Sequence, residues 1–138
     1  MIIMAVDFGR ARTGVAVCDK GETLAFPSCV ITEYDRDRLI EKLSAKASEL
    51  SAELIVAGLP KNMDGSEGEK AEECRENAEL LEKASGIKVE MWDERCTTVI
   101  AHKALSENGK SMKKHKDTVD AVAATVILEG YLSFRKNK

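Results

Sequence analysis

Apolar residues occur first in short runs and later at helical spacing, and this change predicts a mixed α/β protein. Two apolar runs, residues 2–8 and 13–18, are separated by a short segment that begins at Gly9, so we expect two strands joined by a hairpin. A third strand is expected at 24–31, where Pro27 favours an edge position because proline donates no backbone hydrogen bond. The chain therefore opens with three strands.

Helices and strands alternate after this point. Four apolar residues at helical spacing predict a helix from about residue 35: Leu39, Leu43, Ala47 and Leu50. The run LIVAGLP at 54–60 has no polar residue, which is typical of a parallel strand buried on both faces. The remaining expected elements are an acidic helix at about 67–84 ended by Gly86, a strand at 87–92, helices at about 98–107 and 117–134, and a mobile basic loop at 108–116.

Length and composition bound the class of protein. Of 138 residues, 43% are hydrophobic, enough for one core, so we expect a single domain over 1–138. The four cysteines show no C-x-x-C spacing and are expected to be small buried residues in a reducing cytosol. No apolar run approaches the ~20 residues of a membrane span, and no signal peptide is evident. We expect a cytoplasmic protein without a membrane partner.

Charge is distributed unevenly along the chain. The net charge of −3 neither favours nor excludes a nucleic-acid partner. Glutamates dominate residues 67–82, whereas the segment 110–116 carries four lysines and no acid. This basic segment could bind a nucleic-acid backbone, and it could equally be a solvated coil. The acidic helix is expected to face away from such a substrate.

Asp120 lies on the apolar face of the last expected helix. At 100° per residue it shares that face with Ala124, Ile127 and Tyr131. A charge that points into a core is costly unless it is paired or bound to a cation, so the pattern favours a functional role over a first-turn acid interacting with the helix dipole. Asp117, one turn earlier, is explained equally well as the N-cap.

Other acidic residues lie where strands end. Asp7 is near the end of the first strand, where ligands gather in α/β sheets, although an aspartate that initiates a turn would occupy the same place. Asp93 and Glu94 follow the strand at 87–92. Adjacent strand residues point to opposite faces, but alternation relaxes at strand ends, so periodicity does not choose between them. Either could also cap the following helix.

These acidic positions are far apart in sequence and can converge in space. Carboxylates without histidine or cysteine suit Mg²⁺ or Mn²⁺ rather than zinc. Such a cluster could hold two ions ~4 Å apart and support phosphodiester hydrolysis.

Four segments carry a resemblance to a known family: VDFGRARTGVAVCD, IVAGLPKNMDGSEG, WDERCTT and VDAVAATVIL. Their order and spacing resemble the YqgF/RuvX family of bacterial proteins, described as Holliday junction resolvases and as pre-16S rRNA nucleases. The resemblance covers residues 4 to about 132. It implies an α/β, RNase H-like fold, with a mixed five-stranded sheet and helices on both faces, and it implies a metal-dependent nuclease.

The resemblance also implies which residues form the site. Asp7, Glu94 and Asp120 match the family's catalytic and metal-binding acids, and Asp117 matches a further acid of related resolvases. Asp93 then becomes a supporting residue. Arg12 and Arg95 match basic residues suited to phosphate, although either could instead pair with an acid of the cluster. With the basic segment, the expected substrate-binding residues are Arg12, Arg95, Lys113, Lys114 and Lys116.

The expected cofactor is two Mg²⁺ or Mn²⁺ ions, and the expected partner is structured RNA or branched DNA. Family association favours maturation of the 5′ end of 16S rRNA, for which a monomer suffices. Resolution of a four-way DNA junction is the alternative and would need a homodimer. A non-catalytic nucleic-acid-binding module is a further alternative. The pattern D-x-G…G-V-A-V at residues 7–17 also resembles the phosphate loop of actin-like ATPases and sugar kinases. Those proteins enclose a nucleotide between two such domains, and this chain is long enough for only one.

Overall fold

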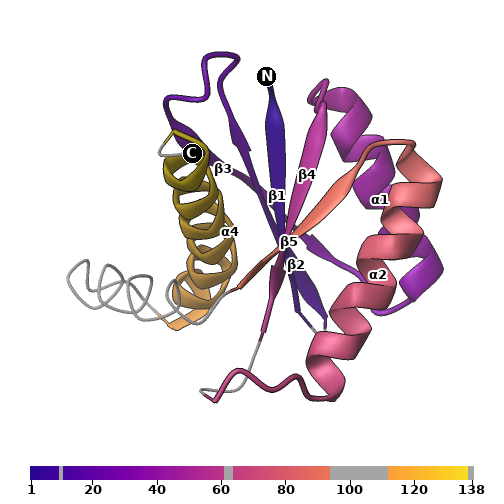
Figure 1. The fold of residues 1–138 in the computed structure, drawn as a ribbon. Helices are drawn as coiled ribbons and strands as arrows, with labels where there is room; N and C mark the ends of the chain where they lie inside the picture. The colour runs from indigo at the N-terminus through magenta and orange to yellow at the C-terminus, as the bar shows by residue number, and fades with distance from the viewer. Residues whose placement is uncertain (10, 61–63, 94–111, 137–138) are drawn as a thin grey trace.

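A computed structural model of the chain describes residues 1–9, 11–60, 64–93 and 112–136, the side chains of 112–121 excepted. Five strands form one sheet in the order β3-β2-β1-β4-β5 (Figure 1). In chain order the elements are β1 (Ile3–Phe8), β2 (Arg12–Cys18), β3 (Ala25–Thr32), α1 (Arg36–Glu49), β4 (Leu54–Leu59), α2 (Glu69–Ser85), β5 (Val89–Asp93) and α4 (Met112–Lys136).

The sheet is mixed, as the resemblance implies. β1 pairs with β2 and β2 with β3 in antiparallel fashion, while β1 with β4 and β4 with β5 are parallel. β3 is an edge strand, which accommodates Pro27 because an edge strand has one side without a partner strand. The register of β2 on β3 shifts between Val15 and Ala16, where a β-bulge interrupts the pairing.

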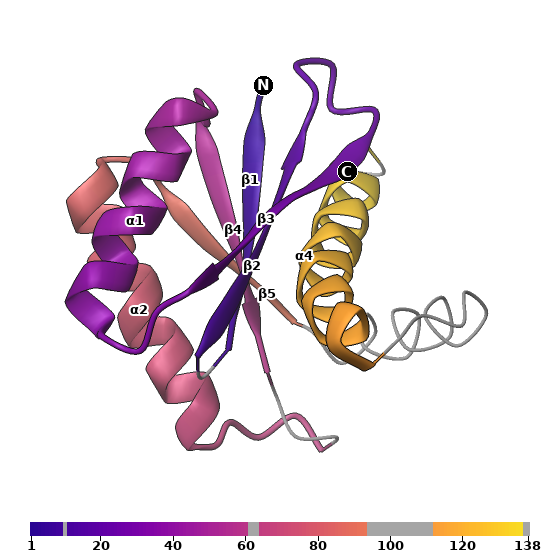
Figure 2. The same cartoon turned by 180° about the vertical axis from the view of Figure 1, so that it is seen from behind.

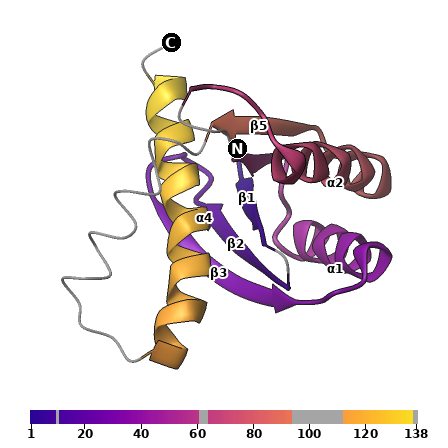
Figure 3. The ribbon, with the colours of Figure 1, turned by 90° about the horizontal axis from the view of Figure 1, so that it is seen from below.

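Helices cover both faces of the sheet. α1 and α2 lie on one side and α4 on the other (Figures 2 and 3). Side chains along β1 alternate between the two faces of the sheet. Met4, Val6 and Phe8 pack with α1 and α2, whereas Ile3 and Ala5 pack with α4. These two apolar clusters form the core, and β4, which lies between them, is an unbroken apolar run.

The helix ends follow local rules for α1 and α2. The Asp35 side chain accepts a hydrogen bond of 3.0 Å from the Arg38 backbone nitrogen and caps α1. Gly86 ends α2 in the left-handed region, at φ 73°. Both ends agree with the sequence expectation.

The start of α4 differs from the expectation. A mobile loop was expected through residue 116 and a helix from Asp117, but α4 begins at Met112. Lysine and methionine are good helix formers, and no glycine or proline interrupts 112–117, so the helix extends upstream. Asp117 is therefore inside the helix and is not its N-cap, and Asp120 is beyond the first turn. The helix expected at 98–107 lies outside the described residues.

Among the described residues, no helix is both long enough and apolar enough to cross a membrane.

Candidate active site

Asp7 lies near the carboxyl end of β1 on the face that α4 covers. Ile3 and Ala5 belong to the α4 cluster, and alternation places Asp7 next in that row. Asp7 is half-buried in a strand whose other residues are buried and apolar. The beginning of α4 lies at the same end of the sheet as the carboxyl ends of β1 and β4 (Figure 1).

Glycine flanks Asp7 on both neighbouring strands. Gly14 of β2 pairs directly with Asp7, and on the other side Val6 pairs with Ala57, so that Asp7 and Gly58 come next on their strands. Both glycines are buried. Paired residues of neighbouring strands project from the same face about 5 Å apart, so the two positions beside Asp7 contribute no side chain on the α4 face. This arrangement allows a ligand to approach the carboxylate close to the sheet.

Arg12 projects from the same face. Arg12, Gly14 and Ala16 alternate along β2, and Ala16 belongs to the α4 cluster. A Cβ on Gly9 would lie 2.1 Å from the Arg12 carbonyl oxygen, so the turn between β1 and β2 closes too tightly for any other residue. The turn therefore brings Arg12 back beside the end of β1, on the face that holds Asp7.

The end of β5 separates Asp93 from Asp7. Trp92 pairs in register with Gly58, and Asp93 with Leu59. Val89 and Met91 pack with the α1 and α2 cluster, whereas Trp92 packs with the α4 cluster. Alternation therefore places Asp93 on the α1 and α2 face, opposite Asp7. The register thus indicates that Asp93 does not share the face of Asp7. Glu94 and Arg95 lie outside the described residues.

The phase of α4 agrees with the sequence expectation. Ala124, Ile127 and Tyr131 are buried against the sheet, while Glu129 and Ser133 are exposed. Asp120 occupies the helical position one turn before Ala124. The side chain of Asp120 is not among those that the structure describes. The same holds for the other expected residues on this helix, which are Lys113, Lys114, Lys116 and Asp117.

Only Asp7 among the expected metal ligands has a described side chain. Among the described residues, no three histidine, cysteine or carboxylate side chains lie close enough to hold a metal ion. The convergence of Asp7, Glu94 and Asp120 therefore stays a prediction. The places of Gly14 and Gly58 directly beside Asp7 follow from strand pairing and not from their spacing in the sequence.

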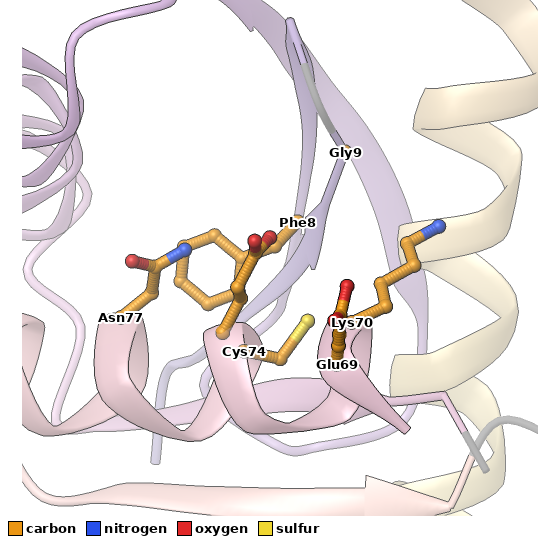
Figure 4. Close-up of a pocket in the computed structure, with 7 residues that line it drawn as sticks. Phe8, Gly9, Glu69, Lys70, Cys74 and Asn77 are labelled. Atoms are coloured by element: carbon orange, nitrogen blue, oxygen red, sulfur yellow. The ribbon is translucent and has the colours of Figure 1, made fainter. Parts of the chain in front are cut away.

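A separate pocket of about 330 Å³ opens at the end of β1 on the other face. Phe8 and Gly9 of the β1 end lie over Cys74 and Asn77 of α2, with Glu69 and Lys70 beside them (Figure 4). The sheet separates this pocket from Asp7, so it is not part of the candidate site.

Comparisons with known proteins place the chain. The family model described as "RuvX: Holliday junction resolvase" matches residues 1–134. A protein of Clostridium botulinum (strain Eklund 17B / Type B) named "Putative pre-16S rRNA nuclease" is 45% identical over 132 residues, which is 96% of each chain. A relative with the same name from Halothermothrix orenii is 40% identical over 135 residues, 98% of this chain and 96% of that one.

Two solved structures share the fold. Thermus thermophilus RuvC has a TM-score of 0.59 at 14% identity and covers 99% of this chain and 97% of its own. Fowlpox virus resolvase, solved with substrate Holliday junction DNA, has a TM-score of 0.59 at 12% identity, covering 98% and 99%. The mixed sheet with helices on both faces is thus the RNase H-like fold of RuvC-type resolvases. Since the family model matches residues 1–134 and relatives matched over nearly their whole length are 40–45% identical, the chain belongs to the RuvX family.

Proposed function

We propose that this protein is a metal-dependent endonuclease that processes the 5′ end of pre-16S rRNA. The observation that carries the proposal is the position of Asp7, half-buried on the α4 face at the carboxyl end of β1. A carboxylate in an otherwise apolar strand needs a charged partner or a cation. The names of full-length relatives at 40–45% identity support a nuclease that acts on precursor rRNA.

The chemistry of the donor set fits a hard cation. Asp7, Glu94 and Asp120, with Asp117 as a further candidate, offer only carboxylate oxygens, which suit Mg²⁺ or Mn²⁺. Asp117 lies within α4 and not at its start, so helix capping does not explain this residue. That supports Asp117 as a further candidate metal ligand. Two bound ions would supply activation of the attacking water and stabilisation of the leaving oxygen.

The protein's own residues would bind and orient the substrate. Arg12 shares the face of Asp7, and its planar guanidinium can donate two hydrogen bonds to one phosphate. In the proposal Arg95 acts in the same way from the segment after β5. The first turns of α4 lie at the end of the sheet where β1 ends (Figure 1). These turns carry Lys113, Lys114 and Lys116, which would contact phosphates of the nucleic-acid backbone beyond the cleaved bond.

The substrate alternative is a four-way DNA junction, which the description of the family model favours. Trimming one RNA end needs one active site, whereas symmetric resolution needs two in a homodimer. The two readings therefore differ in assembly as well as in substrate. We assign the protein to the cytoplasm, where precursor rRNA is processed in bacteria.

The deciding experiment offers purified protein both substrates, a precursor RNA with the 5′ extension and a four-way junction, with Mg²⁺, Mn²⁺ or chelator. We expect metal-dependent cleavage of the RNA. The matched control is the triple variant Asp7→Asn, Glu94→Gln, Asp120→Asn, which should be inactive. Preferential junction cleavage would establish the alternative. Binding of either substrate without cleavage would identify a non-catalytic module, and equal cleavage by the triple variant would reveal a contaminant.

A further inference from the structure

The pocket of about 330 Å³ on the α1 and α2 face is lined by described residues, and the proposed reaction does not use it. Phe8 and Gly9 form one wall, and the first half of α2 forms the other. The α2 residues that line the pocket recur at helical spacing and share one face of the helix: Glu69, Lys70, Glu73, Cys74 and Asn77. A volume of this size is at the lower end of the range for small-ligand sites.

The polar groups of this pocket include acceptors without donors. Among the described residues, no cation pairs with the carboxylate of Glu69 or Glu73, and no group donates to the buried Oδ1 of Asn77. Other carboxylates of α2 and of the residues just before it do have cationic partners: Glu67 with Arg75, Glu76 with Arg36, and Glu79 with Lys83. The carboxylates that line the pocket are thus available to a ligand.

A ligand that fills the pocket has to offer hydrogen-bond donors to carboxylates and an apolar face to Phe8. A nucleobase combines both properties, since its edge carries polar groups and its faces pack against aromatic side chains. Guanine has two donors side by side on its Watson–Crick edge, the N1 imino and the N2 amino group, and one carboxylate can accept from both. Adenine and cytosine present an amino group beside an acceptor, so they match a carboxylate less well.

The pocket and the candidate site lie on opposite faces of the same strand end. Asp7 and Phe8 are neighbours in β1 and belong to different faces, and Gly9 begins the turn that follows. A nucleic-acid strand with one phosphate at Asp7 can pass over this turn and place an adjacent base against Phe8.

The charges of the pocket select the base over the backbone. The two carboxylates repel phosphate groups, whereas they attract the donor edge of a base. Figure 4 shows Asn77 at one end of the pocket and Lys70 at the other. Lys70 can therefore contact a phosphate outside the pocket while the base lies within it.

We propose that this pocket is a subsite for a guanine base of the nucleic-acid substrate, in which Glu73 accepts from N1 and N2 and Phe8 packs against the ring. Glu73 is the central choice because it lies one turn from both Glu69 and Asn77 on the lining face. The inference rests on the proposed function. The competing explanations are a solvated hollow and a site for a cation such as an arginine side chain.

The test is a ligand-observed NMR titration of the purified protein with guanosine, inosine and adenosine 5′-monophosphates, in chelator and at constant ionic strength. Inosine monophosphate lacks only the N2 amino group of the guanosine nucleotide. We expect the guanosine nucleotide to bind at least about fivefold more tightly than either of the others. Glu73→Gln should weaken its binding about tenfold, because the amide offers one acceptor in place of two.

Glu72→Gln is the matched control, since Glu72 is exposed on the same helix outside the pocket and the change removes the same charge. This variant should bind the guanosine nucleotide like wild type. In cleavage assays we expect Glu73→Gln to raise KM for the RNA several-fold with little change in kcat, as loss of uniform binding does. Both substitutions are at exposed positions, and equal Tm values check that each variant is folded.

Agmatine, which carries the guanidinium of arginine without a carboxylate, is the probe for a cation site. Tighter binding of agmatine than of the guanosine nucleotide would overturn the inference in favour of that site. Equal binding of the guanosine and inosine nucleotides, unchanged binding in Glu73→Gln, or no binding at all would also overturn it. Cleavage of RNA without nucleotide binding would reject the subsite alone. Nucleotide binding by a protein that cleaves neither RNA nor junction would reject the proposed function and keep the guanine site.

Discussion

Exchange of the two adjacent acids at the end of β5 tests the assignment of the metal ligand. Asp93 is in register with Leu59 and shares the face of Val89 and Met91, so it points away from the face of Asp7. Glu94 is the ligand in our proposal. Glu94→Gln should therefore remove most of the metal-dependent stabilisation, whereas Asp93→Asn should keep it.

The size of the effect follows from linkage. Metal at ~10 mM that binds a site with Kd of ~1 mM stabilises the folded state by about 1.4 kcal/mol. In a domain of this size, that corresponds to a rise in Tm of roughly 3 to 6 °C. Both substitutions replace a carboxylate by an amide of nearly the same shape, so each removes one negative charge with little change in side-chain volume.

The assay is a set of reversible melts with Mg²⁺ or Mn²⁺ and with chelator, at constant ionic strength, followed by cleavage assays on the same preparations. We expect Glu94→Gln to abolish cleavage and largely spare substrate binding. Asp93→Asn should have a milder effect on cleavage. Equal or reversed losses in well-folded variants would refute the reasoning from register.

Three further predictions concern the substrate surface, the first turn and the β2–β3 connection. Alanine at Lys113, Lys114 and Lys116 should weaken nucleic-acid binding across sequences and flatten its salt dependence by up to ~3 units of slope, and an unchanged slope in a salt titration would exclude these phosphate contacts. Gly9→Ala should lower Tm by several degrees in chelator, because the new methyl would collide with the Arg12 carbonyl oxygen at 2.1 Å; an unaltered Tm would contradict the tight turn. Hydrogen bonds from the Leu24 and Thr23 backbone nitrogens and the Thr23 hydroxyl lower the pKa of Asp19 from 3.8 to about 2. A carboxyl with a lowered pKa stabilises the fold above its unfolded value and loses that effect as pH falls from about 4 to about 2. Asp19→Asn should thus be less stable than wild type at neutral pH, with the difference shrinking over that range in parallel denaturant titrations, and a constant difference would contradict it.

Local patterns in the sequence predicted most of the elements. The described strands and helices begin and end within about two residues of the expected positions, apart from the start of α4. Capping by Asp35 and termination by Gly86 depend on a few neighbouring residues, so they can be read without the fold. The same reasoning placed the start of the last helix at Asp117, whereas α4 begins at Met112. Asp117 has the chemistry of a cap, but the lysine-rich segment before it is also compatible with a helix.

The sequence by itself predicted acidic residues near the ends of two apolar strands and on the apolar stripe of the last helix, because alternation and helical periodicity are properties of neighbouring residues. It could not determine that Asp93 lies on the face opposite Asp7, or that Gly14 and Gly58 lie on either side of Asp7. The sequence could likewise not show that Gly130 of α4 lies against the indole ring of Trp92 in β5. Only the tertiary structure decided these points, because strand order, register and the packing of a helix on a sheet join residues that no local pattern relates.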